Sequence, residues 1–238
     1  MSDNPYAPPT AELGRGLEQS LGTGDFDFGR CLSEAWARTW SNFPLWLVAS
    51  LVGLLAMLAA TLTVIGLFVL VPVLMWGFFA FYLRMYDGGA ELGDVFSGFS
   101  RYGQALAGML GWWGVTFLIA LVGQAPLLIA QAVGSGLGIA AGYGIYIAVN
   151  FLVTPRITFA AFLMVDRGIR LGDAISTSWE RTGPLMWKLA GLMLLMIAVL
   201  FGGAIALLIG IIPASVIGYL MWTSAYRQIF GGAPQPAA

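Results

Sequence analysis

Three long stretches of the chain carry no charged residue, and they constrain the fold more than any other feature. They are residues 39–83, 102–155 and 189–226. A helix needs ~20 apolar residues to cross a bilayer, so each stretch can hold two spans and a turn. Lipid offers no partners for backbone polar groups, so spanning segments must be helices or closed barrels. Barrel strands alternate apolar and polar residues. These continuous runs therefore predict an all-α integral membrane protein with six transmembrane helices.

The distribution of charge predicts how these helices are oriented. Hydrophobic residues make up 59% of the chain and charged residues only 10%, whereas soluble domains carry about 25% charged residues. The Lys and Arg side chains lie before, between or after the three predicted hairpins, and short basic loops stay in the cytoplasm. We therefore expect both termini to be cytoplasmic. The formal net charge of -1 gives no indication of nucleic-acid binding.

A threefold internal repeat accompanies the three uncharged stretches. Each predicted hairpin follows a short segment with one apolar face, which is typical of an amphipathic interfacial helix. The segments share an apolar residue, a glycine and a charged residue, followed by a serine four positions after the glycine. The serines are Ser33, Ser97 and Ser176. A proline then recurs in the second helix of each pair, with Arg84, Arg167 or Arg227 following 12 to 14 residues later.

These patterns predict a simple division of the chain. Residues 1–26 are rich in Pro and Gly and have little periodic apolar content, so we expect a disordered cytoplasmic tail. Residues 27–230 form the six-helix membrane domain, and residues 231–238 form a second disordered tail. The predicted repeat units are 27–86, 91–168 and 170–230.

Prolines and glycines inside the apolar stretches predict local helix geometry. Pro72, Pro155 and Pro213 are each expected to lie within a span and to bend it, since proline removes a backbone hydrogen bond. Small residues at a spacing of four let helices approach closely. Gly134, Gly138 and Gly142 have this spacing. We expect them to serve helix packing within the bundle, with an oligomer interface as the less favoured alternative.

One cation lies a little inside a predicted span. Arg156 lies ten positions before Asp166, which is ~15 Å along a helix and close to the middle of the bilayer. An arginine at that depth is costly unless it is paired or hydrated. One hypothesis is that Arg156, with Asn150 and Lys188, binds an anionic group such as a lipid phosphate. The alternative is structural: Arg156 bonds Asn150 and backbone carbonyls, and Lys188 extends toward the interface.

No catalytic constellation is visible. The chain has no His and a single Cys, which excludes a Cys/His zinc site, a Ser-His-Asp triad and an internal disulfide. We expect no cofactor and no bound metal. A membrane enzyme would need the cytoplasmic acids to gather around a metal ion. The acids considered for this role are Glu34, Glu91, Asp94, Asp173 and Glu180.

Short motifs resemble those of known proteins. Residues 87–99 (DGGAELGDVFSGF), 171–179 (LGDAISTSW) and 4–8 (NPYAP) resemble segments of uncharacterised bacterial multi-pass membrane proteins. Those proteins are similar to the membrane domain attached to some glycerophosphodiester phosphodiesterases. The resemblance implies a bundle in the bacterial inner membrane. The phosphodiesterase catalytic domain is absent, so the resemblance implies no catalytic residue.

The sequence thus predicts a membrane protein without predicting a reaction. We expect a non-enzymatic scaffold or accessory protein whose partners are membrane lipid and other membrane proteins or a second copy of itself. A transporter or channel-like protein for a small or amphiphilic anion is the alternative, and it would require a continuous polar path through the bundle.

Overall fold

The computed structural model describes residues 24–205 and 210–231, and all regular structure within these ranges is helical. The helices are α2 (Phe28–Ser41), α3 (Phe43–Thr61), α4 (Val64–Asp87), the 3₁₀ helix η1 (Leu92–Arg101), α5 (Tyr102–Val133), α6 (Gly136–Leu152), α7 (Thr154–Arg167), α8 (Leu171–Thr182), α9 (Met186–Ile205) and α10 (Ile211–Phe230).

Within the described ranges, five helical stretches are long and apolar enough to cross a membrane. They are Phe43–Thr61, Val64–Asp87, Leu92–Val133, Gly136–Arg167 and Met186–Ile205. The sixth predicted span corresponds to α10, which has 20 residues but is not among the five. Its C-terminal part contains Ser224, Arg227 and Gln228, which lower its mean hydropathy. Residues 206–209, which precede it, lie outside the described part of the chain.

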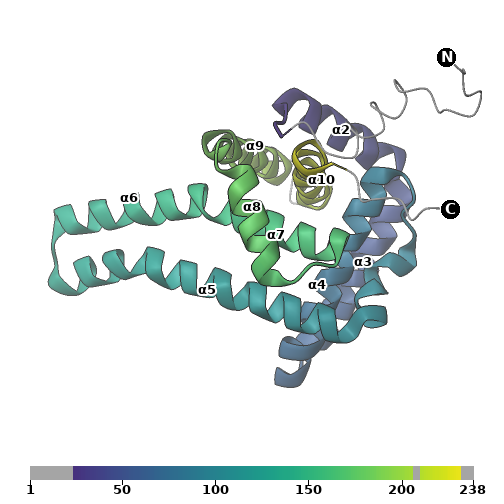
Figure 1. Cartoon of the computed structure of the whole chain (residues 1–238), viewed down its shortest axis with the longest axis horizontal. Helices are drawn as coiled ribbons and strands as arrows, with labels where there is room; N and C mark the ends of the chain where they lie inside the picture. The colour runs from purple at the N-terminus through teal and green to yellow at the C-terminus, as the bar shows by residue number, and fades with distance from the viewer. Residues whose placement is uncertain (1–23, 206–209, 232–238) are drawn as a thin grey trace, which may run out of the picture.

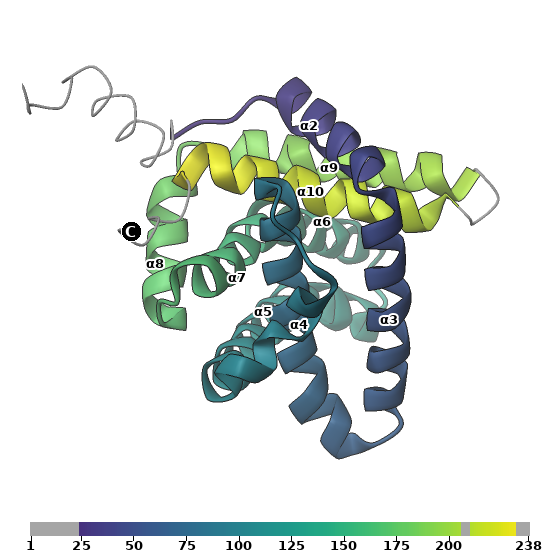
Figure 2. The ribbon, with the colours of Figure 1, turned by 90° about the vertical axis from the view of Figure 1, so that its right-hand side faces the viewer.

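Three helix pairs extend from a shared centre in different directions. They are α3–α4, α5–α6 and α9–α10, and the helices of each pair pack side by side. In Figure 1 the α5–α6 pair extends to the left, and in Figure 2 the α9–α10 pair extends to the right while α3–α4 extends downwards. The short helices α2 and η1 and the helix α8 precede α3, α5 and α9 in the chain.

The centre of the molecule is built from α4, α7 and α10, which contact one another pairwise. Aromatic rings fill it. Phe162 on α7 stacks on Tyr226 of α10 with ring centroids 5.4 Å apart, and it meets Phe79 of α4 edge-on at 4.9 Å. Phe159 and Tyr226 are fully buried. Such aromatic pairs stabilise a core beyond the burial of their area, so these three helices form the packed core of the fold.

The fourth predicted span is present but contains a helix junction. The sequence predicts that Pro155 lies inside this span and bends it, but the structure ends α6 at Leu152 and starts α7 at Thr154. Pro155 therefore lies in the first turn of α7. Proline is tolerated there because the first N–H groups of a helix need no intrahelical acceptor. The N–H of Arg156 instead donates to the carbonyl of Val153 at 3.1 Å, which tightens the junction.

The other two predicted kink residues have different surroundings. Pro72 lies inside α4, where its missing N–H interrupts the helical ladder. Pro213 is the third residue of α10, so the prediction of a mid-span kink is wrong there for the same reason as at Pro155. Only α4 therefore carries its repeat proline in a helix interior.

The predicted N-terminal tail ends earlier than expected. Residues 24–26 belong to the described structure, and Phe26 is buried with its ring centroid 5.4 Å from that of Phe28. Asp25 pairs with Lys188 of α9. The remaining tail predictions, for residues 1–23 and 232–238, fall outside the described residues.

Candidate functional site

Arg156, the predicted anion-binding residue, is held by an aromatic ring. Its side chain is buried between α7 and α8, and its guanidinium carbon lies 4.4 Å from the ring centroid of Trp179. The hydroxyl of Ser178 donates to the Arg156 carbonyl at 2.6 Å. A cation over an indole face is stabilised electrostatically. Its Nε has no hydrogen-bond partner among the described residues. The structural hypothesis expects the Arg156 guanidinium to bond Asn150 and backbone carbonyls, and no such bond is present among the described residues, where the contact with Trp179 is found in their place.

The two residues predicted to assist Arg156 do not contact it. The amide of Asn150 donates to the carbonyl of Tyr146 in its own helix at 2.9 Å. The Lys188 ammonium pairs with both carboxylate oxygens of Asp25 at 2.5 and 2.6 Å. Among the described contacts, no hydrogen bond or ion pair joins Arg156, Asn150 and Lys188 into one site. The reason is positional, because they lie on three different helices.

The three glycines that are predicted to serve helix packing have two different roles. Gly134 is the left-handed C-cap of α5 with φ 69° and so precedes α6. Gly142 lies against α5, because a Cβ at this position would be only 2.6 Å from the Leu127 Cα. At Gly138 the same atom would be 3.1 Å from the Cβ of Ala130. Gly138 and Gly142 thus allow α5 and α6 to pack closely within one hairpin.

A buried ion network lies where α4, α7 and α10 end. The Arg227 side chain on α10 is 9% exposed, and its Nη1 donates to Asp166 of α7 at 2.8 Å. Its Nη2 and Nε donate to the two oxygens of Asp87 of α4 at 2.6 and 3.1 Å. The Tyr226 hydroxyl donates to Asp166 at 2.7 Å. One guanidinium therefore joins the ends of the three core helices.

A second ion pair adjoins this network at the start of η1. Asp94 is buried, and one of its oxygens accepts from Nη1 of Arg84 on α4. Its other oxygen accepts from the Glu91 N–H at 2.8 Å as part of a capping box. A capping box satisfies orphan donors at a helix start. This arrangement fixes η1 across the end of α4.

Several of these charged groups, though not Asp94, line a polar cavity of about 350 Å³. The side chains that matter for its chemistry are Arg84, Arg101, Arg227, Asp87, Asp166 and Ser97. Arg101 forms no ion pair with any other described residue, and the hydroxyl oxygen of Ser97 is buried without a hydrogen-bond partner in the described part of the chain. The cavity therefore combines paired charges with unused donors.

The sequence repeat indicated part of this site. The equivalent arginines Arg84 and Arg227 line the cavity, and Arg167 donates to the Phe230 carbonyl beside it. Their partners Asp87 and Asp166 were not singled out, because each pair joins residues far apart in the sequence. The sequence predicts no bound metal, and an acidic cluster was considered only as what a membrane enzyme would need. Among the described residues, no group of three or more Cys, Asp or Glu is placed to hold a metal ion.

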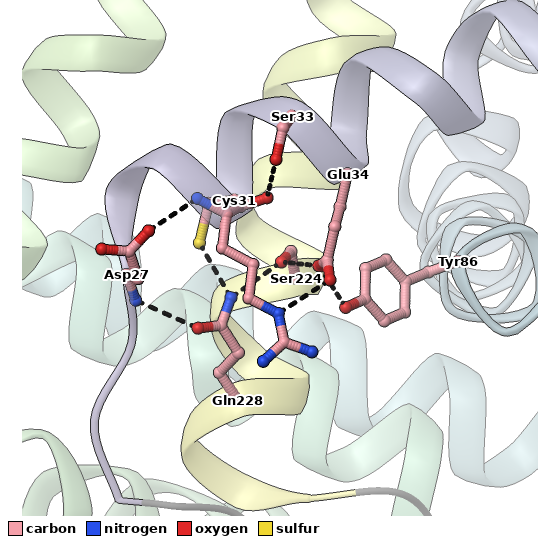
Figure 3. Close-up of polar contacts among 8 residues, drawn as sticks. Asp27, Cys31, Ser33, Glu34, Tyr86, Ser224 and Gln228 are labelled. Carbon is pink, nitrogen blue, oxygen red and sulfur yellow. Dashed lines mark hydrogen bonds and ion pairs between the residues drawn. The ribbon is translucent and has the colours of Figure 1, made fainter.

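A third polar cluster joins α2 to α4 and α10, as Figure 3 shows. Glu34 accepts from the Tyr86 hydroxyl at 2.6 Å, the Ser224 hydroxyl at 2.7 Å and Nε of Arg30 at 2.8 Å. Gln228 donates to the Ser224 hydroxyl at 3.0 Å and to the Cys31 sulfur at 3.4 Å. The cluster is saturated with internal hydrogen bonds, which indicates a structural role.

Protonation equilibria support this structural interpretation. Burial alone would raise the pKa of Glu34, but hydrogen bonds from Arg30, Tyr86 and Ser224 outweigh it and lower the pKa below its ordinary value. Burial raises the pKa of the Cys31 thiol to about 11. A thiol with so high a pKa is a poor nucleophile at neutral pH.

At the surface, hydrogen bonds from Lys188 and the Phe26 N–H lower the pKa of Asp25.

Comparison with known proteins adds no assignment to this geometry. No family model, curated protein or solved structure matches the chain.

Proposed function

We propose that the chain is a non-enzymatic scaffold or accessory protein of the bacterial inner membrane, which engages lipid and partner helices through its apolar hairpins. The observation that carries this proposal is the low burial of the spanning helices. In the most apolar window of each candidate span, 50% of residues are buried for α4, but only 11% for Leu92–Val133 and 6% for Gly136–Arg167. Apolar helices with so little internal contact need lipid or another helix around them.

The proposal includes a six-span topology of three repeated hairpins, each preceded by an interfacial amphipathic helix. Three features support it. Helices α2, η1 and α8 precede the hairpins, the second helices of the three units converge in the core, and those helices end near Arg84, Arg167 and Arg227. The charged helix ends then lie on the cytoplasmic side, together with both termini.

The exposed apolar surface of the hairpins also suggests the kind of partner. The exposed apolar residues of α5 and α6 include Phe117, Leu118, Ile129 and Ile147. In a bilayer such side chains contact acyl chains, helices of other membrane proteins or a second copy of this chain. The resemblance to bacterial multi-pass membrane proteins is consistent with that setting.

A transporter or channel-like protein for a small anion is the second candidate, and the arginine-lined cavity favours it. A transporter also needs a path toward the opposite face. The large pockets along the hairpins, lined by residues such as Leu54, Met57 and Phe78 or Val199 and Ile217, are apolar. The accessory role therefore has the stronger support.

Spin labels in liposomes test the proposed function. Labels would replace Leu118, Ile129 and Ile147, one at a time, with Glu180 at the polar end of α8 as the matched control. We expect the three hairpin labels to be relaxed by oxygen dissolved in lipid and the control to be relaxed by a water-soluble nickel complex. Protection of a hairpin label from both reagents would identify a helix partner at that position. Relaxation of the hairpin labels by nickel would overturn the proposal.

A further inference from the structure

The three repeat serines provide an internal comparison. Ser33 donates to the carbonyl of Arg30 at 3.2 Å, and Ser176 donates to the carbonyl of Asp173 at 3.1 Å. Ser97 makes no such bond, and its buried hydroxyl oxygen has no partner among the residues described. A buried polar group without a partner is destabilising. Ser97 thus departs from its two equivalents at the position where the chain has a polar cavity.

The unused donors around Ser97 are those that a phosphate group requires. Arg101 lines the cavity without an ion pair to any described residue, and its Nη1 lies near the cap of α7, 3.7 Å from where a Cβ of Gly168 would be. Within the described part of the chain, Arg84 pairs with Asp94 through Nη1 alone, and its side chain is 57% exposed. Guanidinium groups bind phosphate oxygens through charge-assisted, often paired hydrogen bonds.

The carboxylates of the cavity are already engaged. Arg227 donates to both oxygens of Asp87 and to Asp166, which also accepts from the Tyr226 hydroxyl. Their negative charge is therefore partly neutralised within the protein. A ligand entering the cavity meets two carboxylates held by Arg227 and, beside them, the free donors of Arg84, Arg101 and Ser97.

The neighbouring pocket indicates what is attached to the phosphate. Trp76 lines the polar cavity and also a second pocket of about 300 Å³, whose other walls include Gly108, Met164 and Leu171. Gln104 and Arg170 also line the second pocket, but most of its surface is apolar, so it suits hydrocarbon. A polar and an apolar compartment that share one tryptophan match the two parts of an amphiphile.

We propose that this cavity binds the phosphate of a phospholipid headgroup through Ser97, Arg101 and Arg84, with the start of an acyl chain beside Trp76. The inference rests on the proposed membrane function and gives it a specific ligand class. It also moves the predicted anion site from Arg156, which Trp179 holds, to the cavity between α4, η1, α7 and α10.

The test uses the full-length protein, purified and delipidated in detergent, with binding followed by native mass spectrometry. The ligands are short-chain phosphatidylglycerol, the matching diacylglycerol without phosphate, and glycerol 3-phosphate. The variants are Ser97→Ala and Arg101→Gln, with Ser176→Ala and Arg181→Gln as matched controls, since both control side chains lie on α8 outside the cavity.

We expect phosphatidylglycerol to bind, diacylglycerol not to bind, and each cavity variant to weaken phosphatidylglycerol binding by about 10-fold or more, as the loss of a hydrogen bond to a charged group predicts. The controls should bind like the original protein. Without ligand, Ser97→Ala should unfold at the same or a higher temperature, since it removes an unpaired buried hydroxyl. This result would separate lost binding from lost folding.

Three outcomes would overturn the inference. If the cavity variants bind phosphatidylglycerol as tightly as the controls do, the cavity does not recognise phosphate. If diacylglycerol binds as tightly as phosphatidylglycerol, the phosphate is not required for binding. Glycerol 3-phosphate binding as tightly as the lipid would make the ligand a soluble phosphate ester. The spin-label experiment on the hairpins does not depend on any of these outcomes. It therefore tests the proposed function independently of the lipid-binding inference.

Discussion

The core of α4, α7 and α10 and the projecting α5–α6 hairpin are built on different principles, although both are apolar. In the core, aromatic rings interlock and one arginine joins three helix ends. The hairpin has close internal contacts at glycines such as Gly138 and Gly142, while Leu121, Val122 and Ile145 are exposed. Side chains of the core therefore pack against one another, whereas many side chains of the hairpin are left to contact the surroundings of the protein.

Removing the central cation should have the largest effect. Arg227→Ala leaves the buried Asp166 without its cation, and breaking a buried ion pair from one side costs about 3–5 kcal/mol, whereas the half-exposed Asp87 is solvated by water. We expect the unfolding temperature of the purified protein to fall strongly. Arg30→Ala is the control, because the Arg30–Glu34 pair is exposed at Arg30 and such pairs contribute little. Equal stability of the two variants would show that the network does not hold the core together.

A matched pair of phenylalanines compares core and hairpin directly. Phe159 is fully buried in the core, whereas Phe117 on α5 is 63% exposed. Phe159→Ala should cost about 3–5 kcal/mol of unfolding free energy, as expected for a buried aromatic residue. Phe117→Ala should cost far less in detergent, where surfactant replaces the lost contact. A large loss with Phe117→Ala would mean that the hairpin packs against the protein.

Two nearby glycines of α6 test whether α5 and α6 pack closely. A side chain at Gly142 would collide with the backbone of Leu127, whereas at Gly144 it would meet nothing within 4 Å. Gly142→Val should therefore separate α5 from α6, at a cost of about 1–3 kcal/mol for overpacking, and Gly144→Val should not. Distances between spin labels at Val122 and Ile145 would report the separation. If the Gly142 variant left this distance unchanged, the two helices would not be in close contact there.

The smallest effect should be a pH dependence at the Glu34 cluster. Because the folded state lowers the pKa of Glu34 from its ordinary value of 4.5, its contribution to stability is present above that value and is lost as the pH falls through the lowered one. Glu34→Gln should therefore unfold more easily than the original protein at pH 7, and the difference should shrink in acid. Glu180→Gln, on the exposed face of α8, is the control. A difference that persists or grows in acid would exclude this linkage.

The contrast also explains what could be predicted from the sequence. Lengths and charges of the apolar stretches predicted helices α3 to α6 and α9, because hydrophobic length is a local property. The break at Val153 was missed because proline fits either a helix interior bend or a first turn, and tertiary packing decides between them. Arg156 was recognised as a costly cation, but its partner Trp179 belongs to another helix. The Arg227–Asp87 pair joins residues 140 positions apart, which no local pattern reveals.

Cysteine accessibility from the two sides of the membrane tests the central claim most directly. Leu137→Cys places a thiol at the tip of the α5–α6 hairpin, where the side chain is 89% exposed, and Glu180→Cys places one on α8 near the core. The native Cys31 is buried and should stay unreactive. We expect a membrane-impermeant thiol reagent to label Leu137→Cys in intact cells and Glu180→Cys only after permeabilisation. Labelling of Glu180→Cys from outside, or protection of Leu137→Cys until the membrane is opened, would contradict a core at the cytoplasmic face with hairpins that cross the bilayer.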